Sequence, residues 1–318
     1  MSRSGTYSCS GSMPRRRASN ISWYSGRWRF SNAMSDCEDQ TFGLYTHASM
    51  RLRLRIHNWI AAHRQTAVGQ AFRRLGLGLW RASENDGGSL GNNGEAELLR
   101  RLASHPGSTV FDVGAFHGDW TARAIASWPR AQVHCFDLAS EHVDFLHKRF
   151  DGDPRVLVNA FGLGEGETDA IGFRDPKHPE MTSVVLRDGL APGTVAFDVR
   201  IRRGDDYVSQ HGIDHIDILK VDTEGLDLAV LRGFSSTLAA GRIDLIQFEF
   251  TLWAAISRTW LHDFYDLLTP LGFQLGKLFP DGVEWRPYQA EHEIFLRCNY
   301  VAVHWSRPDL AAALASRY

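Results

Sequence analysis

Short apolar runs rich in Val, Ile and Phe alternate with helix-like segments from Glu95 onward. Runs such as "STVFDVGAF", "AQVHCFDL" and "IDILKVD" are interspersed with segments of helical periodicity, such as "GDWTARAIASWP" and "SEHVDFLHKRF". Strand–helix–strand units of this length form parallel sheets, because a right-handed crossover packs each helix against the sheet. We therefore predict an α/β fold with a doubly wound, mostly parallel, Rossmann-like sheet.

The charges divide the chain into a basic leader and an acidic remainder. The segment up to Arg81 contains 13 Arg and three acidic residues, a net charge of +10, whereas the whole chain has a net charge of −2, which leaves −12 for the rest. Residues 1–45 are rich in Ser and Arg and lack hydrophobic periodicity, so we expect a disordered arm. We expect residues 46–94 to be a basic, amphipathic helical leader and linker, residues 95–305 the main domain, and residues 306–318 a C-terminal tail.

Two interpretations of the helical leader remain open: it packs on the domain, or it contacts a membrane surface or a polyanion. No apolar run approaches the ~20 residues of a membrane span, and the N-terminus lacks the apolar core of a secretory signal. The four cysteines are scattered without a close pair, which favours free thiols and a reducing compartment. We therefore expect a cytoplasmic protein.

The turn after the first predicted strand contains the strongest sign of a ligand. In "FDVGAFHG", Asp112, Gly114 and Gly118 form an acid-x-Gly-x-x-x-Gly pattern, and Asp137 follows at the end of the next strand. Glycines allow a ligand to approach the backbone, and an acid at the second strand end accepts the hydroxyls of a ribose. The Gly-x-Gly-x-x-Gly loop of nicotinamide-dependent oxidoreductases is not present. The pattern suits S-adenosylmethionine better, because this cofactor has a ribose and no phosphate.

The run "LKVDTEG" places Lys220, Asp222 and Glu224 at alternate positions, which an extended chain would direct to one face. The chain has only four Lys (148, 177, 220 and 277) among its 35 basic residues, so a Lys inside a predicted strand indicates a specific need for an ammonium group. We predict that these three residues are catalytic, with a desolvated Lys or a carboxylate as the base. A structural Lys–carboxylate cluster is the alternative. Glu249 would supply a third carboxylate for a divalent cation, but a local hydrogen-bond acceptor is the commoner role for such a residue, and we predict no metal site.

Several segments together resemble the FkbM-type methyltransferases: "TVFDVGAFHGDWT", "VHCFDLASEHVDFL", "AFGLGEGE", "MTSVV" and, above all, "GIDHIDILKVDTEGLDLAVLRGF". The resemblance extends from about residue 95 to 305. It departs from the family pattern at Phe-Asp-Leu, where Phe-Glu-Pro is common, and at Phe116-His117, where Asn-Ile is usual. The second departure marks His117 as a candidate substrate contact.

The resemblance implies a class I methyltransferase fold in which the strand at 216–222 lies beside the first strand. It also implies S-adenosylmethionine as the cofactor, with contacts from Asp112, Gly114, Gly118, Asp137, Leu138, Ala160 and Phe161. Thr182 and Ser183 would line the acceptor side.

The expected activity is O-methylation of a hydroxyl group on a sugar, a glycan, or a glycosylated or polyketide-like metabolite. The expected partner is thus a small-molecule or glycan acceptor and not a nucleic acid. A nicotinamide-dependent oxidoreductase and a non-catalytic ligand-binding module of the same fold remain the alternatives.

Overall fold

The computed structural model describes residues 47–87, 89–105, 107–186 and 192–317, and it does not describe the side chains of residues 47–50. The predicted arm, 1–45, therefore lies outside the described residues. The chain divides into two compact units, Met1–Gly69 and Gln70–Tyr318. The described part of the first unit contains helix α1 (His47–Ala62) and the beginning of helix α2 (Ala67–Ser83).

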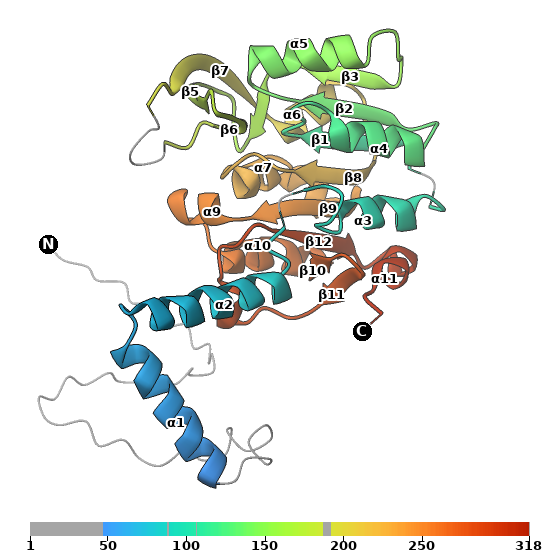
Figure 1. Ribbon diagram of the computed structural model, residues 1–318. Coiled ribbons are helices and arrows are strands. Elements are labelled where there is room, and N and C mark those ends of the chain that lie inside the picture. Colours follow the sequence, from blue (N-terminus) through green and yellow to red (C-terminus); the bar gives the residue numbers. More distant parts are fainter. Residues whose placement is uncertain (1–46, 88, 106, 187–191, 318) are drawn as a thin grey trace, which may run out of the picture. The chain divides into compact units, whose positions relative to one another are not determined.

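The second unit is built around an eight-stranded sheet with the strand order β11-β10-β12-β9-β8-β1-β2-β3 (Figure 1). Five neighbouring strands of this sheet, β9, β8, β1, β2 and β3, pair in parallel. Strand β12 pairs antiparallel with β9 and β10. The strands are β1 (Thr109–Val113), β2 (Gln132–Phe136), β3 (Val156–Asn159), β8 (Ile216–Val221), β9 (Ile243–Phe250), β10 (Phe273–Phe279), β11 (Gly282–Trp285) and β12 (Cys298–His304). The predicted α/β fold with a mostly parallel sheet is confirmed.

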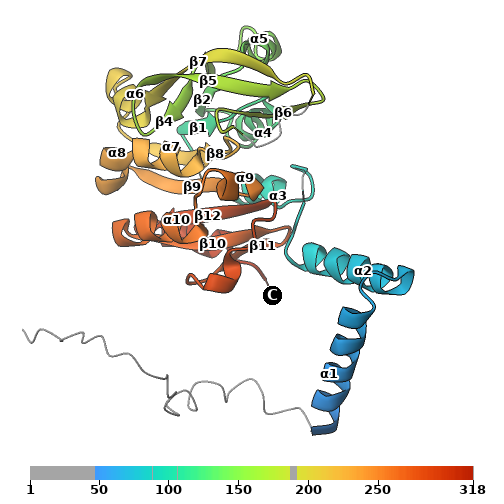
Figure 2. The same cartoon turned by 90° about the vertical axis from the view of Figure 1, so that its left-hand side faces the viewer.

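Helices cover both faces of this sheet, as the alternation of buried side chains along each strand requires. Figure 2 shows α7, α8 and α10 on one side of the strands and α3 and α4 on the other. The buried side chains form two hydrophobic cores. Phe111 and Leu219 belong to the first core, and the neighbouring strand residues Val110 and Ile218 belong to the second core. The helices are α3 (Glu95–Leu102), α4 (Asp119–Ser127), α5 (Ser140–Arg149), α6 (Gly204–Gln210), α7 (Asp227–Gly233), α8 (Ser235–Ala239), α9 (Leu252–Ile256), α10 (Leu261–Leu268) and α11 (Pro308–Leu314), and two short 3₁₀ helices span Thr269–Leu271 and Ala290–His292.

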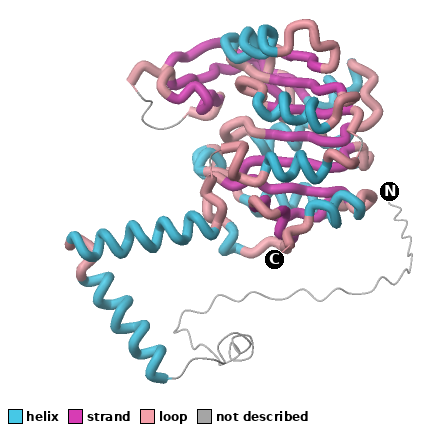
Figure 3. Tube along the Cα trace, turned by 45° about the vertical axis from the view of Figure 1, so that its right-hand side comes forward, coloured by secondary structure: helices cyan, strands magenta, loops and turns pink. Residues whose placement is uncertain are grey.

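A second, four-stranded sheet has the order β4-β7-β5-β6, and its strands are drawn in magenta in Figure 3. The strands are β4 (Gly162–Gly164), β5 (Thr168–Asp175), β6 (His178–Ser183) and β7 (Val195–Arg203). The apolar run "RVLVNAFGLG" contributes β3 to the main sheet and β4 to the second one. The chain leaves the main sheet after Asn159, which the apolar pattern alone does not reveal.

Strands β1 and β8 lie side by side, with Asp112 opposite Lys220 in the register, as expected for the strand after the crossover. The chain order reverses at this point, and ligands of open α/β sheets bind outside such a switch point. The loops after both strands approach closely, because a Cβ on Gly114 would lie 1.8 Å from the carbonyl oxygen of Asp222. Gly114 also has a φ of 79°, so two independent constraints require glycine here.

Both ends of the second unit pack on the sheet. Lys277 of β10 is fully buried, and its ammonium lies 2.7 Å from the carboxylate of Glu84, just after α2. At the other end, Leu310 and Leu314 of α11 belong to the second core. Residues 308–314, expected to be part of a tail, thus form a packed helix.

Candidate functional site

A cavity opens at the carboxyl ends of β1, β2 and β8, which is where ligands of open α/β sheets bind. We call it the first cavity. Its lining combines these strand ends with the beginning of β4 and with β6 of the second sheet. The residues that line it are Val113, Gly114, Phe116, Phe136, Asp137, Leu138, His142, Gly162, Leu163, Glu180, Thr182, Asp222, Thr223, Glu224 and Leu226.

Asp137 lies on the wall of the first cavity, and its carboxylate organises the surrounding loops. One oxygen accepts a hydrogen bond from the backbone N–H of Phe116 at 2.9 Å. The other accepts from the N–H of Ala139 and is paired with His142 Nδ1, both at 3.0 Å. The oxygen bonded to Phe116 has a second lone pair, so Asp137 retains acceptor capacity for a ligand hydroxyl.

His142 was not predicted as a site residue. It is buried on the first turn of α5, and its Nε2 has no hydrogen-bond partner among the described residues. Buried polar atoms are nearly always paired, so a cavity-lining nitrogen without a partner marks a place for a ligand atom. A His five positions after a strand-end acid was the signal available in the sequence.

Some of the predicted cofactor contacts lie away from this cavity. Gly114, Asp137 and Leu138 line it, whereas Asp112, Gly118, Ala160 and Phe161 are not among its described lining residues. A Cβ on Gly118 would lie 2.6 Å from the Phe150 ring, which explains the glycine by packing. Ala160 and Phe161 line a separate surface groove beside Arg202, because the chain has already turned toward the second sheet.

Asp112 and Lys220 form a buried ion pair beneath the first cavity. The ammonium of Lys220 lies 3.0 Å from Asp112 and 3.4 Å from Asp222, and it donates to the carbonyl of Gly114 at 3.1 Å. Asp112 also accepts a hydrogen bond from Thr121 at 2.7 Å. Asp112 is completely buried, so in this structure it supports the cofactor loop from behind and does not face a ligand.

The charge state of Lys220 argues against its predicted role as a base. Burial opposes the ammonium form, but the negative charges of Asp112 and Asp222 outweigh this effect and hold the pKa of Lys220 above its usual range. An amine that stays protonated cannot accept a proton. Lys220 therefore positions Asp112, Asp222 and the Gly114 loop.

Asp222 and Glu224 line the first cavity, and Glu249 of β9 joins them. Each of the three residues offers one carboxylate oxygen, and these oxygens lie within 4.8 Å of one another. The alternate spacing of "LKVDTEG" does not explain this arrangement, because β8 ends at Val221 and Glu224 has a φ of 51°. The turn, rather than a continued strand, brings Glu224 back toward Asp222.

Crowding of like charges perturbs the acidic cluster formed by Asp222, Glu224 and Glu249. Burial, followed by the charges of Asp222 and Asp227, raises the pKa of Glu224 to about 9. Burial and the charge of Asp222 raise the pKa of Asp227 to about 7, and the same two causes raise that of Glu249. Such a cluster favours a cation, either an organic one or a divalent ion with oxygen ligands.

A second cavity of about 560 Å³ adjoins the first, within the ~300–1,000 Å³ range of small-molecule sites. The two share Gly114, Phe116, Glu180, Asp222 and Glu224. The walls that belong only to the second cavity are Arg81, Asp86, Met181, Glu249, Thr251, Leu252, Trp253, Ile256, Phe295, Leu296 and Arg297. The acidic cluster thus stands where the two cavities meet.

Other predicted candidates have local partners. Thr182 lines the first cavity, whereas the hydroxyl of Ser183 donates to the carbonyl of Glu224 at 2.6 Å and ties β6 to the β8 turn. His117 stacks on Phe116 with ring centroids 3.8 Å apart and is not among the lining residues of either cavity. Trp253 lines the second cavity, whereas Trp260 packs edge-on against Phe295.

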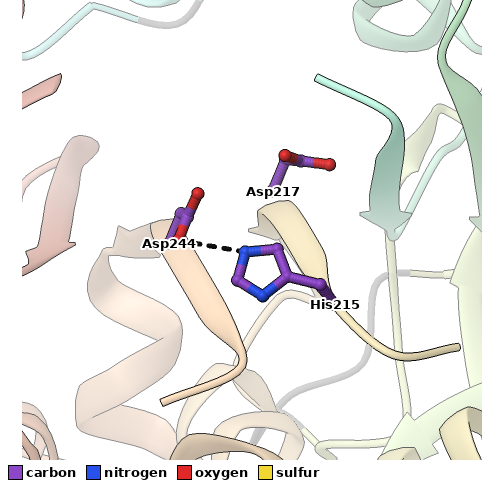
Figure 4. A group of neighbouring side chains, drawn as sticks. All are labelled: His215, Asp217 and Asp244. Atoms are coloured by element: carbon purple, nitrogen blue, oxygen red, sulfur yellow. Dashed lines mark ion pairs between the residues drawn. The ribbon is translucent and has the colours of Figure 1, made fainter. Parts of the chain in front are cut away.

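A second group of metal-compatible side chains, His215, Asp217 and Asp244, lies near the amino ends of β8 and β9 (Figure 4). His215 Nε2 is 3.0 Å from Asp244, which also pairs with Arg307. Asp217 accepts hydrogen bonds from the N–H groups of Ser108 and Thr109, each at 2.8 Å. Arg307 neutralises Asp244, and the N–H groups satisfy Asp217 as an acceptor, so the group joins the strand ends.

The two described cysteines, Cys135 and Cys298, are buried and free, as predicted. Cys9 and Cys37 lie outside the described residues.

Comparisons with known proteins find a family model that matches part of the chain. Residues 168–291 match the family model described as "Methyltransferase FkbM domain". This range contains β5 to β11, and therefore three of the four strands of the second sheet together with the acidic cluster. No curated protein matches the chain.

Solved structures with a similar fold are methyltransferases or their relatives. A precorrin-6y C5,15-methyltransferase from Geobacter metallireducens has a TM-score of 0.37 at 8% identity, over 65% of this chain and 85% of that one. A TehB-like SAM-dependent methyltransferase from Corynebacterium glutamicum has a TM-score of 0.34 at 14% identity, over 74% and 98%. SMU.1697c from Streptococcus mutans, solved in complex with SAH, has a TM-score of 0.38 at 10% identity, over 66% and 96%.

The family match agrees with the motifs around Asp222 and points to S-adenosylmethionine as the cofactor. Residues 168–291 are therefore similar to the methyltransferase domain of the FkbM type, as the motifs in this range predicted.

Proposed function

We propose that this methyltransferase transfers a methyl group to a hydroxyl of a sugar, a glycan or a glycosylated metabolite. The observation that supports this proposal is the junction of two cavities at one acidic cluster. The first cavity would hold S-adenosylmethionine and the second the acceptor. Both would then reach Asp222 and Glu224, which line both cavities.

The residues of the first cavity fit this cofactor. Asp137 offers acceptor capacity for the ribose hydroxyls, and the unpaired Nε2 of His142 offers a further polar contact. A Cβ on Gly162 would lie 2.8 Å from the Ile201 side chain and 2.9 Å from that of Leu138, so close packing requires glycine at this wall. The lining contains no run of backbone N–H groups at a Gly-x-Gly-x-x-Gly helix start, which a pyrophosphate would need.

The acidic cluster can serve both the cofactor and the acceptor. When bound, S-adenosylmethionine supplies a methyl group on a positively charged sulfonium. A positive charge at the cavity junction relieves the repulsion among Asp222, Glu224 and Glu249 and favours their ionised forms. The same positive charge lowers the raised pKa of Glu224, so that its carboxylate is ionised near neutral pH and can act as the base. Its carboxylate oxygen would accept the proton that the acceptor hydroxyl loses when the new C–O bond forms.

The second cavity combines features that suit a polyhydroxylated acceptor. Carboxylates such as Asp86 and Glu249 accept hydrogen bonds from hydroxyl groups, and Trp253 offers an aromatic face for a sugar ring. Arg81 and Arg297 add donors for an acidic substituent. Trp253 follows Thr251, whose hydroxyl accepts a hydrogen bond from the Trp253 N–H and fixes the start of α9.

The proposal is tested by mass spectrometry of a panel of sugars and glycosylated metabolites incubated with S-adenosylmethionine. The wild-type protein should add one methyl group to an acceptor hydroxyl. Glu224→Gln should reduce turnover by roughly 10²–10⁴-fold, with little change in affinity for S-adenosylhomocysteine.

Glu167→Gln makes the same chemical change on an exposed strand-connecting turn and should leave turnover unchanged. Binding of S-adenosylhomocysteine without transfer to any acceptor would instead indicate a binding module. Tight binding of NAD in its place would indicate an oxidoreductase. Assays with and without Mg²⁺ or a chelator show whether the acidic cluster acts through a metal ion.

A further inference from the structure

Helix α2 has an apolar stripe along one face. Val68, Leu75 and Leu79 recur at a spacing of seven and four residues, which places them on the same side of a helix. Their exposed fractions are 54%, 61% and 64%, respectively. Burying apolar surface of this size is favourable, so an exposed stripe at helical spacing indicates a surface to be covered.

The opposite face of α2 is basic. Arg73, Arg74 and Arg81 are all exposed, and the helix contains no acidic residue. Residues 40–83 as a whole contain seven Arg and no Asp or Glu. The segment therefore has a large excess of positive charge beside an apolar face, although Arg81 pairs with Asp86 at 3.4 Å.

We propose that α2 docks on an anionic lipid surface. A helix with an apolar face and an arginine-rich polar face lies in the plane of the membrane interface, with its apolar side chains among the acyl chains. Arginines beside the stripe attract anionic headgroups. No helix of the described residues has the length and apolar character needed to cross a bilayer. The charge favours lipid over another copy of this chain, because two such helices would repel each other.

The test measures cosedimentation of the full chain with vesicles of phosphatidylcholine alone or mixed with phosphatidylglycerol. The protein should bind the mixed vesicles, and added salt should weaken this binding. Arg73→Gln combined with Arg74→Gln should lower the partition coefficient by roughly 25-fold, about fivefold for each charge removed. The matched control is Arg123→Gln with Arg130→Gln, two exposed arginines outside α2, and it should bind like wild type.

A second pair of variants tests the apolar stripe. Leu75→Ser with Leu79→Ser should reduce binding to mixed vesicles, whereas Ile171→Ser with Trp305→Ser, which changes exposed apolar side chains elsewhere, should not. Thermal unfolding and affinity for S-adenosylhomocysteine should stay unchanged in both pairs, which separates docking from the proposed methyl transfer.

Three results would overturn the proposal. The first is an absence of binding to the mixed vesicles by the wild-type chain. The second is undiminished binding by both α2 variants, which would assign the interaction to another segment. The third is a dimer in solution that dissociates in the leucine variant, since the stripe would then cover a second copy of the chain.

Discussion

Lys220 has three acceptors within 3.4 Å, namely Asp112, Asp222 and the carbonyl of Gly114. It joins the ends of β1 and β8 at the point where the first cavity begins. Its removal would leave Asp112 without the partner of its charge in the core. We therefore expect Lys220 to contribute mainly to the stability of the fold rather than directly to the methyl transfer.

We expect Lys220→Met to reduce the free energy of unfolding by about 3–5 kcal/mol, because one partner of a buried ion pair is lost. Chemical denaturation measures this change. The double variant Asp112→Leu/Lys220→Met removes both charges and should recover much of the loss. If the single variant keeps wild-type stability and only turnover falls, Lys220 has a direct catalytic role.

Asp137 and His142 allow a test of the cofactor wall. Asp137→Asn should weaken binding of S-adenosylhomocysteine by about 1.5–3 kcal/mol, the range for hydrogen bonds that involve a charged group. His142→Phe keeps an aromatic ring but lacks the unpaired nitrogen, so it should weaken binding by about 1 kcal/mol. Calorimetric titration provides both values.

His147→Phe is the control for His142→Phe, since His147 is exposed on the same helix. It should bind the ligand like wild type. Unchanged dissociation constants in both Asp137→Asn and His142→Phe would exclude this wall as the ribose side of the site.

The acidic cluster predicts how stability depends on pH. The pKa of Glu224 rises from 4.5 to about 9 in the folded chain, so between these values the folded state holds a proton that the unfolded state has lost. Stability must then fall as pH increases through this window. Asp227, with its pKa raised to about 7, adds to the slope only at the lower pH values.

Thermal unfolding of the ligand-free protein at a series of pH values should therefore show a decline between pH 7 and about 9. Glu224→Gln should flatten the decline in part, and its combination with Glu249→Gln should flatten it further, because Glu249 also has a raised pKa. If the wild-type protein becomes more stable as pH increases across this interval, the pKa values of these carboxyl groups are not raised in the folded state.

At the scale of elements, the segment after α2 is fastened to β10 by an ion pair of unequal partners. Lys277 is fully buried, whereas the side chain of Glu84 is 28% exposed. Asn85 adds hydrogen bonds to the carbonyls of Asn93 and Leu278, at 2.9 and 3.0 Å. The attachment therefore depends on neutralising a cation inside the sheet.

This asymmetry predicts unequal effects of the two substitutions. Glu84→Ala leaves the buried ammonium without its partner and should cost about 3–5 kcal/mol of stability. Lys277→Met replaces the ammonium with an apolar chain, and the half-exposed Glu84 can hydrate, so the expected cost is below about 1 kcal/mol. Chemical denaturation of both variants measures the two losses in the free energy of unfolding. Equal losses would show that burial of the Lys277 ammonium does not determine what the ion pair contributes to stability.

At the scale of the whole molecule, the neighbouring positions of the Asp112 and Lys220 strands were expected from the resemblance to the FkbM-type methyltransferases. The sequence itself predicted the mostly parallel main sheet through its alternating apolar runs. It could not predict that these two side chains pair, because strand register depends on contacts distant in the chain. It also missed His142, whose approach to Asp137 depends on how α5 begins.

The second sheet was not predicted for a different physical reason. Much of β5 and β7 is partly exposed, so these strands lack the continuous apolar pattern of the main sheet. Strand β6 nevertheless supplies Glu180 and Thr182 to the first cavity. The sequence pattern does not reveal a wall built by a peripheral sheet, nor that Ala160 and Phe161 line a separate groove.

Arg81 belongs both to α2 and to the wall of the second cavity. A protein held by α2 on a lipid surface would therefore meet an acceptor carried by the same surface through lateral diffusion in two dimensions. The rate of methylation would depend on the number of acceptor molecules per unit area of membrane rather than on their bulk concentration. Diluting a lipid-borne acceptor with inert lipid, at constant total amount, should then slow methylation.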